Sequence, residues 1–133
     1  MSTIAPPQPG TKIELGNIAM ASTCNDLVTI NSFTVTLVGT QLQAYAQVTP
    51  NNADDSLVVL SVSAGDGKGT TYAGANFTAA GENGIPGEIV SVLAFRDGYD
   101  PNVSGSTVIG VVQGYLLTSS GNCWISETRP FNL

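Results

Sequence analysis

Hydrophobic and polar residues alternate with a period of two along much of this chain. Residues 28–37 interleave apolar side chains with threonines, and residues 42–48 interleave them with glutamines and a tyrosine. Side chains of a β-strand point alternately to its two faces, so each run predicts a strand with one buried face. Gly39-Thr40 separates the two runs. A short connector that contains glycine predicts a β-hairpin at this point.

Further runs of the same kind predict strands over residues 13–20, 57–62, 71–77, 107–117 and 123–126. The run 71–77 is short, and we expect it to form an edge strand. The run 88–95 is the most continuously apolar of all and predicts a central strand that is covered on both faces. Residues 129–133 are expected to form a short tail after the last strand.

The number and spacing of these runs predict an all-β fold. No stretch of ten residues shows helical spacing with caps, and seven to eight short strands separated by turn signals are typical of a sandwich or barrel. We expect a single antiparallel β-sandwich domain over residues 12–133, immunoglobulin-like, with a jelly roll as the alternative. Residues 1–11 contain Pro6, Pro7 and Pro9, which predicts an extended N-terminal arm before this domain.

Charged side chains are scarce, and this limits the chemistry that the chain can perform. The 133 residues include no histidine and four Lys+Arg, with a net charge of −6 and only 11 % charged residues. A serine or threonine nucleophile would therefore lack its usual base, so we expect no enzyme and no cofactor. The scattered cations also argue against nucleic acid or an anionic membrane as a partner.

The two cysteines, Cys24 and Cys123, lie near opposite ends of the chain. They could form a disulfide that closes a long loop, or remain as two small buried thiols in a reducing compartment. Zinc is not expected, because no further cysteine or histidine could complete its four ligands.

One loop is a candidate calcium site. Asp97, Asp100 and Asn102 place three hard oxygen ligands within six residues, which is the ligand chemistry that calcium requires. The loop does not match the twelve-residue EF-hand pattern, and the same residues are common turn formers. Beyond this candidate we expect no metal site.

The strand around residue 45 predicts a contact surface. If the small apolar residues of 42–48 face the core, the amides and the aromatic ring between them share the outer face. Such a face is neutral and rich in hydrogen-bonding groups, and interfaces are depleted of charge and enriched in aromatic rings. We expect the interface residues to be Gln41, Gln43, Tyr45, Gln47, Tyr99 and Trp124.

Two functional hypotheses from different classes follow. The first is a structural assembly protein, such as a capsid decoration, cement or tail component of a phage or virion, which packs against copies of itself or a larger lattice. The second is a carbohydrate-binding module, lectin-like or adhesive, in which Tyr45, Tyr72, Tyr99 or Trp124 stacks on sugar rings. The first ten residues do not resemble a secretory signal, so we expect cytoplasmic synthesis followed by incorporation into a virion or extracellular particle.

The predicted arm gives a first test of the assembly hypothesis. Removing residues 1–11 should weaken assembly while leaving the fold intact, because an extended arm can strap a neighbouring subunit without contributing to the core. Oligomer mass by light scattering and thermal unfolding measure the two effects separately. Unchanged assembly would show that the arm is only a tail.

Overall fold

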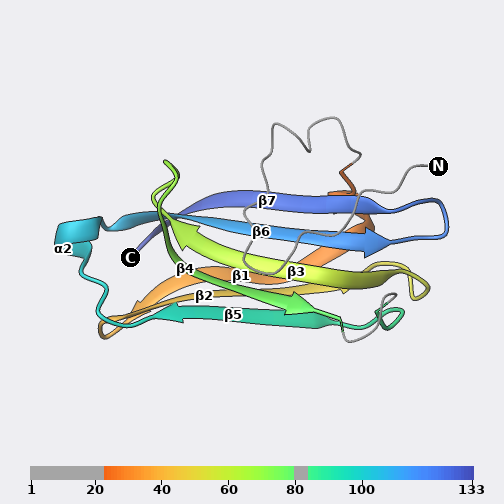
Figure 1. Cartoon of the computed structure of the whole chain (residues 1–133), viewed down its shortest axis with the longest axis horizontal. Coiled ribbons are helices and arrows are strands. Elements are labelled where there is room, and N and C mark those ends of the chain that lie inside the picture. The colour runs from red at the N-terminus through yellow and green to blue at the C-terminus, as the bar shows by residue number, and fades with distance from the viewer. Residues whose placement is uncertain (1–22, 80–83) are drawn as a thin grey trace.

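Seven antiparallel strands form two packed sheets in the computed structural model, which describes residues 23–79 and 84–133 (Figure 1). One sheet has the order β1-β2-β5, with β1 at Val28–Val38, β2 at Gln41–Pro50 and β5 at Val90–Arg96. The other has the order β4-β3-β6-β7, with β4 at Thr71–Thr78, β3 at Ser56–Gly65, β6 at Thr107–Leu117 and β7 at Cys123–Asn132. The predicted all-β sandwich is confirmed. The predicted arm over residues 1–11 and the predicted strand over residues 13–20 lie outside the described residues.

The order of the strands is that of an immunoglobulin-like sandwich with one change. In the seven-stranded constant-type arrangement the fourth strand pairs with the fifth, in the sheet that also contains the first two. Here β4 pairs with β3 in the opposite sheet. One border of the β1-β2-β5 sheet is therefore formed by β5 itself.

The hairpin predicted between the first two strands is present. Val38 and Gln41 are directly paired, so the connection is the two-residue turn Gly39-Thr40. Gly39 has φ +63°, a conformation that residues with a Cβ rarely adopt. Tight turns of this kind match the twist of the two strands and fix their register.

The inner faces of the two sheets form the main core. On β2, Leu42, Ala44, Ala46 and Val48 have no exposed surface, as the alternation in the sequence predicts. They face apolar residues of the other sheet, including Leu60, Val62, Val108, Val112 and Leu116. Burying apolar side chains from both sheets in this way supplies the main favourable term for folding.

One glycine is required by the close approach of two aromatic rings. Phe33 of β1 and Phe131 of β7 make an edge-to-face contact with ring centroids 5.1 Å apart. A Cβ on Gly110 of β6 would lie 2.7 Å from Phe131 and 3.0 Å from Phe33. Gly110 thus leaves the space in which the rings meet between the sheets.

Two expectations about the strands were wrong. The run 88–95 does not form a central strand, because β5 pairs only with β2 and exposes Leu93 and Phe95. Residues 129–132 are not a tail but the end of β7, which includes Pro130. Proline is tolerated there because β7 is an edge strand, where a missing N–H costs no ladder hydrogen bond. The short run 71–77 was predicted as an edge strand, and β4 confirms it.

The outer face of the four-stranded sheet carries a second buried cluster. Val59, Tyr115 and Trp124 form one row across β3, β6 and β7, and the rings of Tyr115 and Trp124 have centroids 4.7 Å apart. All three are less than 5 % exposed. Trp124 therefore packs outside the core that lies between the two sheets.

Cys24 and Cys123 form a disulfide in the structure. It joins the segment before β1 to the first residue of β7, across a sequence separation of 99 residues. Of the two alternatives that the sequence left open, the structure therefore has the disulfide. A cross-link over so long a loop lowers the conformational entropy of the unfolded chain. In the chain-entropy model this stabilises the folded state by roughly 4–5 kcal/mol.

Replacing both cysteines with serine should lower the free energy of unfolding by about 2–5 kcal/mol. Denaturant unfolding of the oxidised protein and of the Cys24→Ser/Cys123→Ser variant measures the difference. A reductant should shift the unfolding midpoint of the wild-type protein and leave that of the double variant unchanged. Equal stability of the two proteins would contradict a stabilising disulfide.

Candidate functional site

The outer face of the β1-β2-β5 sheet is the candidate functional site. Because alternate residues of β2 are buried in the core, Gln41, Gln43, Tyr45 and Gln47 lie together on the opposite face, each partly exposed. Thr34 of β1 and Leu93 of β5 flank Tyr45 on either side in the register of the sheet. The structure thus brings together four of the six residues predicted for the interface.

Hydrogen bonds link the side chains along β2. Gln43 Nε2 donates to Gln41 Oε1 over 2.6 Å, and Gln41 Nε2 donates to Asp97 Oδ1 over 2.8 Å. On the other side of Tyr45, Gln47 Nε2 donates to Ser91 Oγ over 3.2 Å. These bonds orient the amides, which keep further donor and acceptor capacity for a partner.

The same face carries two exposed apolar side chains that sequence reasoning did not assign to it. Leu93 is 48 % exposed and Phe95 is 60 % exposed, and they pair across the strands with Tyr45 and Gln43 respectively. The sequence pattern predicts that the run 88–95 is buried on both faces, so it does not identify Leu93 and Phe95 as surface residues. Ser91 was the available signal, because a serine in phase with Leu93 and Phe95 marks their face as the one that meets solvent or a partner.

The outer-face residues of this sheet carry no charge within the three strands. On β1 they are hydroxyl side chains, Val38, and Asn31, which donates to Thr49 Oγ1 at the register shift; on β5 they are Ser91, Leu93 and Phe95. Asp97, just beyond the end of β5, is the acid that borders the amides. An uncharged face with amides and exposed rings has the composition found at protein interfaces.

Tyr99 and Trp124, the other two predicted interface residues, lie elsewhere and are buried, with 5 % and 4 % exposure. The Tyr99 hydroxyl donates to the Gly105 carbonyl over 2.6 Å, and its ring contacts that of Tyr72 edge-on. Burial raises the pKa of Tyr99 by disfavouring the phenolate, and Tyr72 adds to this. Tyr99 therefore anchors the loop after β5 and does not extend the face around Tyr45.

The candidate calcium residues take separate roles in the same loop. Asp97 accepts the hydrogen bond from Gln41, whereas Asp100 caps α2 (Pro101–Ser104) by accepting from the backbone N–H of Asn102 over 2.9 Å. Within residues 23–79 and 84–133 there is no group of three or more His, Cys, Asp or Glu side chains that could hold a metal ion. The loop thus has the geometry of a capped turn.

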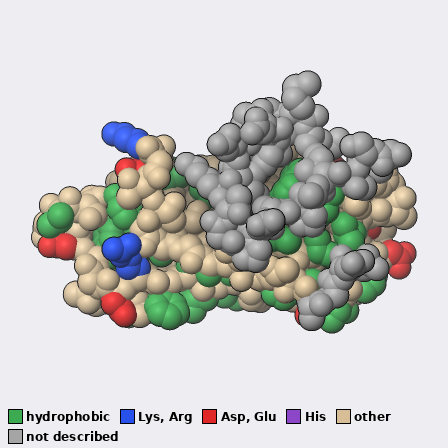
Figure 2. All heavy atoms as spheres, in the orientation of Figure 1, with side chains coloured by type: hydrophobic (Ala, Val, Ile, Leu, Met, Phe, Trp, Pro, Cys, Tyr) green, Lys and Arg blue, Asp and Glu red, His purple; other side chains and the backbone are tan. Residues whose placement is uncertain are grey.

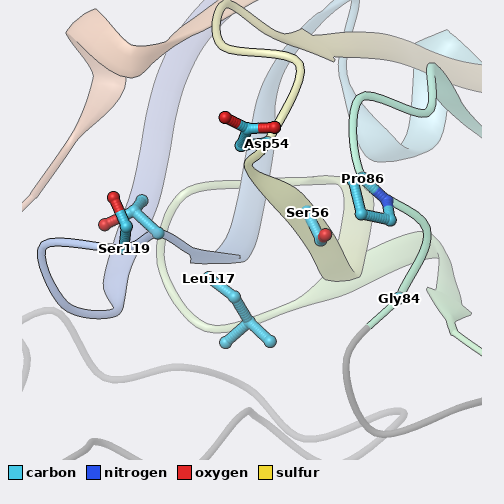
Figure 3. A pocket seen from close by; sticks show the side chains of 7 residues that line it. Asp54, Ser56, Gly84, Pro86, Leu117 and Ser119 are labelled. Carbon is cyan, nitrogen blue, oxygen red and sulfur yellow. The ribbon is translucent and has the colours of Figure 1, made fainter.

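A hollow of about 370 Å³ lies at the other end of the sandwich, where β3 begins and β6 ends (Figure 3). Its lining contains one carboxylate, from Asp54, and the hydroxyls of Ser56, Thr118 and Ser119. Among the described residues that line the hollow there is no amine, guanidinium or imidazole, so these side chains offer no acid–base pair for proton transfer. It is therefore a weaker candidate than the sheet face.

In the part of the chain that the structure describes, no helix has the length and apolar character needed to cross a membrane.

Comparison with known proteins gives little beyond these observations. No protein family model matches the chain, and no curated protein matches it. Among solved structures, a β-glucuronidase from glycoside hydrolase family 2 superposes with a TM-score of 0.43 and 10 % identity, over 80 % of this chain and 11 % of that one. β-Glucosidase 3B from Thermotoga neapolitana, in complex with glucose, gives a TM-score of 0.37 and 16 % identity, over 80 % of this chain and 17 % of that one.

The β-glucosidase DesR from Streptomyces venezuelae, in complex with D-glucose, gives a TM-score of 0.37 and 14 % identity, over 77 % of this chain and 14 % of that one. The chain thus spans less than a fifth of the length of each of these enzymes. Likenesses this remote carry no argument about what this chain does.

Proposed function

We propose that this domain is a non-enzymatic assembly module that binds other protein subunits through the outer face of the β1-β2-β5 sheet. The observation that carries the proposal is the combination of exposed Leu93 and Phe95 with an uncharged row of amides around Tyr45. An exposed sheet face usually includes charged side chains that favour solvent, whereas interface cores are depleted of them. The absence of histidine from the chain supports a role in contact and not in catalysis.

The finer setting that we propose is an accessory protein of a phage or virion, such as a capsid decoration, cement or tail component. This step is an analogy from a small β-domain without catalytic side chains, since a fold does not fix a function. The Cys24–Cys123 disulfide supports residence in an oxidising environment such as the surface of an extracellular particle.

If this chain binds carbohydrate, the second hypothesis, a carbohydrate-binding module, is favoured over the assembly module. Of the four aromatic residues considered for sugar stacking, Tyr99 and Trp124 are buried, whereas Tyr45 and Tyr72 are partly exposed. Tyr45 lies among amides that could also bind sugar hydroxyls. A glycan array therefore belongs in the same experiment.

The proposal is tested by measuring the mass of the complex that contains this chain in its natural source. A complex of several subunits is expected, and Tyr45→Lys should reduce incorporation by roughly tenfold or more, because a buried unpaired charge in an interface is costly. Thr71→Lys is the matched control, since Thr71 is an exposed residue of β4 in the other sheet. It should leave incorporation unchanged.

A chain that occurs free as a monomer in its natural source would contradict the proposal. Selective glycan binding that Tyr45→Ala abolishes would support the carbohydrate-binding module instead. Thermal unfolding of each variant shows whether a loss reflects the surface or the fold.

A further inference from the structure

The edges of the two sheets are not equally protected. A sheet edge presents unpaired backbone N–H and C=O groups to any extended chain, and natural sheets guard their edges with proline, charges, bulges or covering segments. The four edge strands here are β1 and β5 in one sheet and β4 and β7 in the other. Three of the four carry such a guard.

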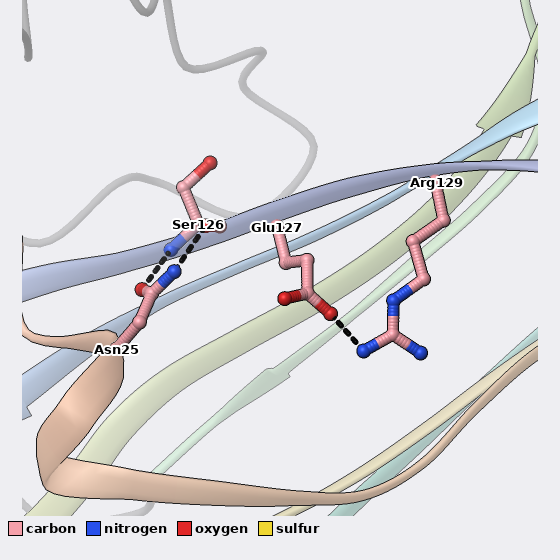
Figure 4. Close-up of polar contacts among 4 residues, drawn as sticks. All are labelled: Asn25, Ser126, Glu127 and Arg129. Carbon is pink, nitrogen blue, oxygen red and sulfur yellow. Dashed lines mark hydrogen bonds and ion pairs between the residues drawn. The ribbon is translucent and has the colours of Figure 1, made fainter.

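The edge of β7 is guarded in several ways (Figure 4). The Asn25 side chain lies against it, donating to the Ser126 carbonyl over 2.7 Å and accepting from the Ser126 N–H over 3.0 Å. The strand also contains Pro130 and the ion pair between Glu127 and Arg129. A second strand could not pair along β7 without displacing these groups.

The edges of β1 and β4 each contain one register shift, near the start of the strand. The register between β1 and β2 shifts between Ile30 and Ser32. The register between β3 and β4 shifts where Ala64 and Gly65 face Ala73 and Thr71. Bulges of this kind bend an edge away from a straight partner.

β5 has none of these guards before its last residue, Arg96. Its pairing with β2 runs from Val90 to Arg96 without a register shift, and residues 90–95 contain neither proline nor a charged side chain. Because β4 belongs to the other sheet, no described strand pairs with this edge. β5 runs along the lower border of the molecule in Figure 1, and hydrophobic side chains reach the surface along that border in Figure 2.

The register of the sheet identifies the free backbone groups of β5. Val38 and Gln41 close a two-residue hairpin and are therefore a hydrogen-bonded pair. Hydrogen-bonded and non-hydrogen-bonded pairs alternate, so the odd-numbered residues of β2 bond to β1 and the even-numbered ones bond to β5. The N–H and C=O groups of Ser91, Leu93 and Phe95 consequently point away from β2.

We infer that β5 pairs with β5 of a second copy of this chain, antiparallel about a two-fold axis. This would join two three-stranded sheets into one continuous six-stranded sheet. The inference rests on the proposed assembly function and names its first partner. It also extends the uncharged face around Tyr45 across both copies.

One register makes the two copies complementary. With Val92 opposite its own counterpart, Ser91 forms hydrogen-bonded pairs with Leu93 of the second copy. Ile89, which is 55 % exposed, then lies opposite Phe95 of the second copy, so each covers the other. Glu88 and Arg96, both exposed, become opposite charges at each end of the paired strands.

The neighbouring register is less favourable. With Leu93 opposite its own counterpart, Ile89 would face Asp97 of the second copy, and Glu88 would face Gly98. Apolar side chains would then lie beside a carboxylate, and both end charges would lose a partner of opposite sign. Charge and apolar matching therefore favour the register centred on Val92 over the one centred on Leu93.

The contact is a small one, because each copy contributes a single strand of seven residues. Interfaces below the standard size are weak or transient, so we expect a dimer with a dissociation constant in the micromolar range, on the order of 1–100 μM. Light scattering and sedimentation over concentrations from about 1 to 500 μM measure it.

Leu93→Lys should weaken this dimer at least tenfold, because lysine on an edge strand opposes pairing. Thr36→Lys is the matched control, since Thr36 is exposed on the same outer face but lies on β1, away from the β5 edge. It should leave the dimer unchanged. Thermal unfolding confirms that both variants remain folded.

A charge swap tests the register. Glu88→Arg alone and Arg96→Glu alone each place like charges opposite one another, and each should weaken the dimer by roughly three- to tenfold. The double variant Glu88→Arg/Arg96→Glu should recover most of the affinity. Arg96 Nη1 also donates to the Tyr72 carbonyl over 3.3 Å, so the stability of the Arg96 variants is measured alongside.

Four results would contradict the inference. A wild-type chain that stays monomeric to about 500 μM would exclude the dimer, and a dimer that Leu93→Lys leaves intact would exclude pairing through β5. A dimer that Thr36→Lys breaks while Leu93→Lys does not would place the contact on the sheet face. A double variant no tighter than the single ones would contradict the register. In each of these cases incorporation into the native complex can persist, so the proposed function is judged separately.

Discussion

The burial of one side of β2 is the constraint on which the rest of this molecule depends. Leu42, Ala44, Ala46 and Val48 are fully enclosed between the sheets. A slip of one residue in register would exchange them for three glutamines and a tyrosine, and burying amides without partners costs roughly 1–3 kcal/mol for each group. The core therefore fixes not only the fold but also the identity of the outer face. The amide row is on the surface because the apolar face of β2 is the one that packs in the core, and alternate residues of a strand point to opposite faces.

The position of the fourth strand has an equally direct consequence. In the constant-type immunoglobulin arrangement the fourth strand covers the edge of the fifth. In this chain β4 pairs with β3, which leaves the edge of β5 without a neighbour among the described strands. A single change of partner thus converts an interior strand into an open edge. The exposed side chains Leu93 and Phe95 lie on that same strand, so backbone and side-chain features that favour contact coincide.

Sequence reasoning predicted the fold and most of the face but misplaced β5 and β7 for identifiable reasons. The period-two pattern was sufficient for β2, because its polar positions are amides and its apolar ones are small. The run 88–95 was ambiguous, since a strand covered on both faces and an edge strand with an exposed apolar face have the same composition. Residues 129–133 were expected to be a tail, whereas an edge strand accepts Pro130 and continues to Asn132. Whether Cys24 and Cys123 are joined or remain thiols could not be derived from the sequence, and the structure shows the disulfide.

The placement of charge explains how a chain with a net charge of −6 could associate with copies of itself. Among the acidic residues that the structure describes, only Glu127 lies within a strand. Asp26 lies in the short 3-10 helix before β1, and the others lie in the turns and loops that connect the strands. Repulsion between exposed charges is largely screened beyond about 8–10 Å in physiological salt. Acids confined to the loops can therefore keep the molecule dispersed in solution without opposing contact at the middle of a sheet. Surfaces built from amides and hydroxyls add to this, because each such group can both donate and accept, so two identical faces can bind one another without a complementary partner of opposite charge.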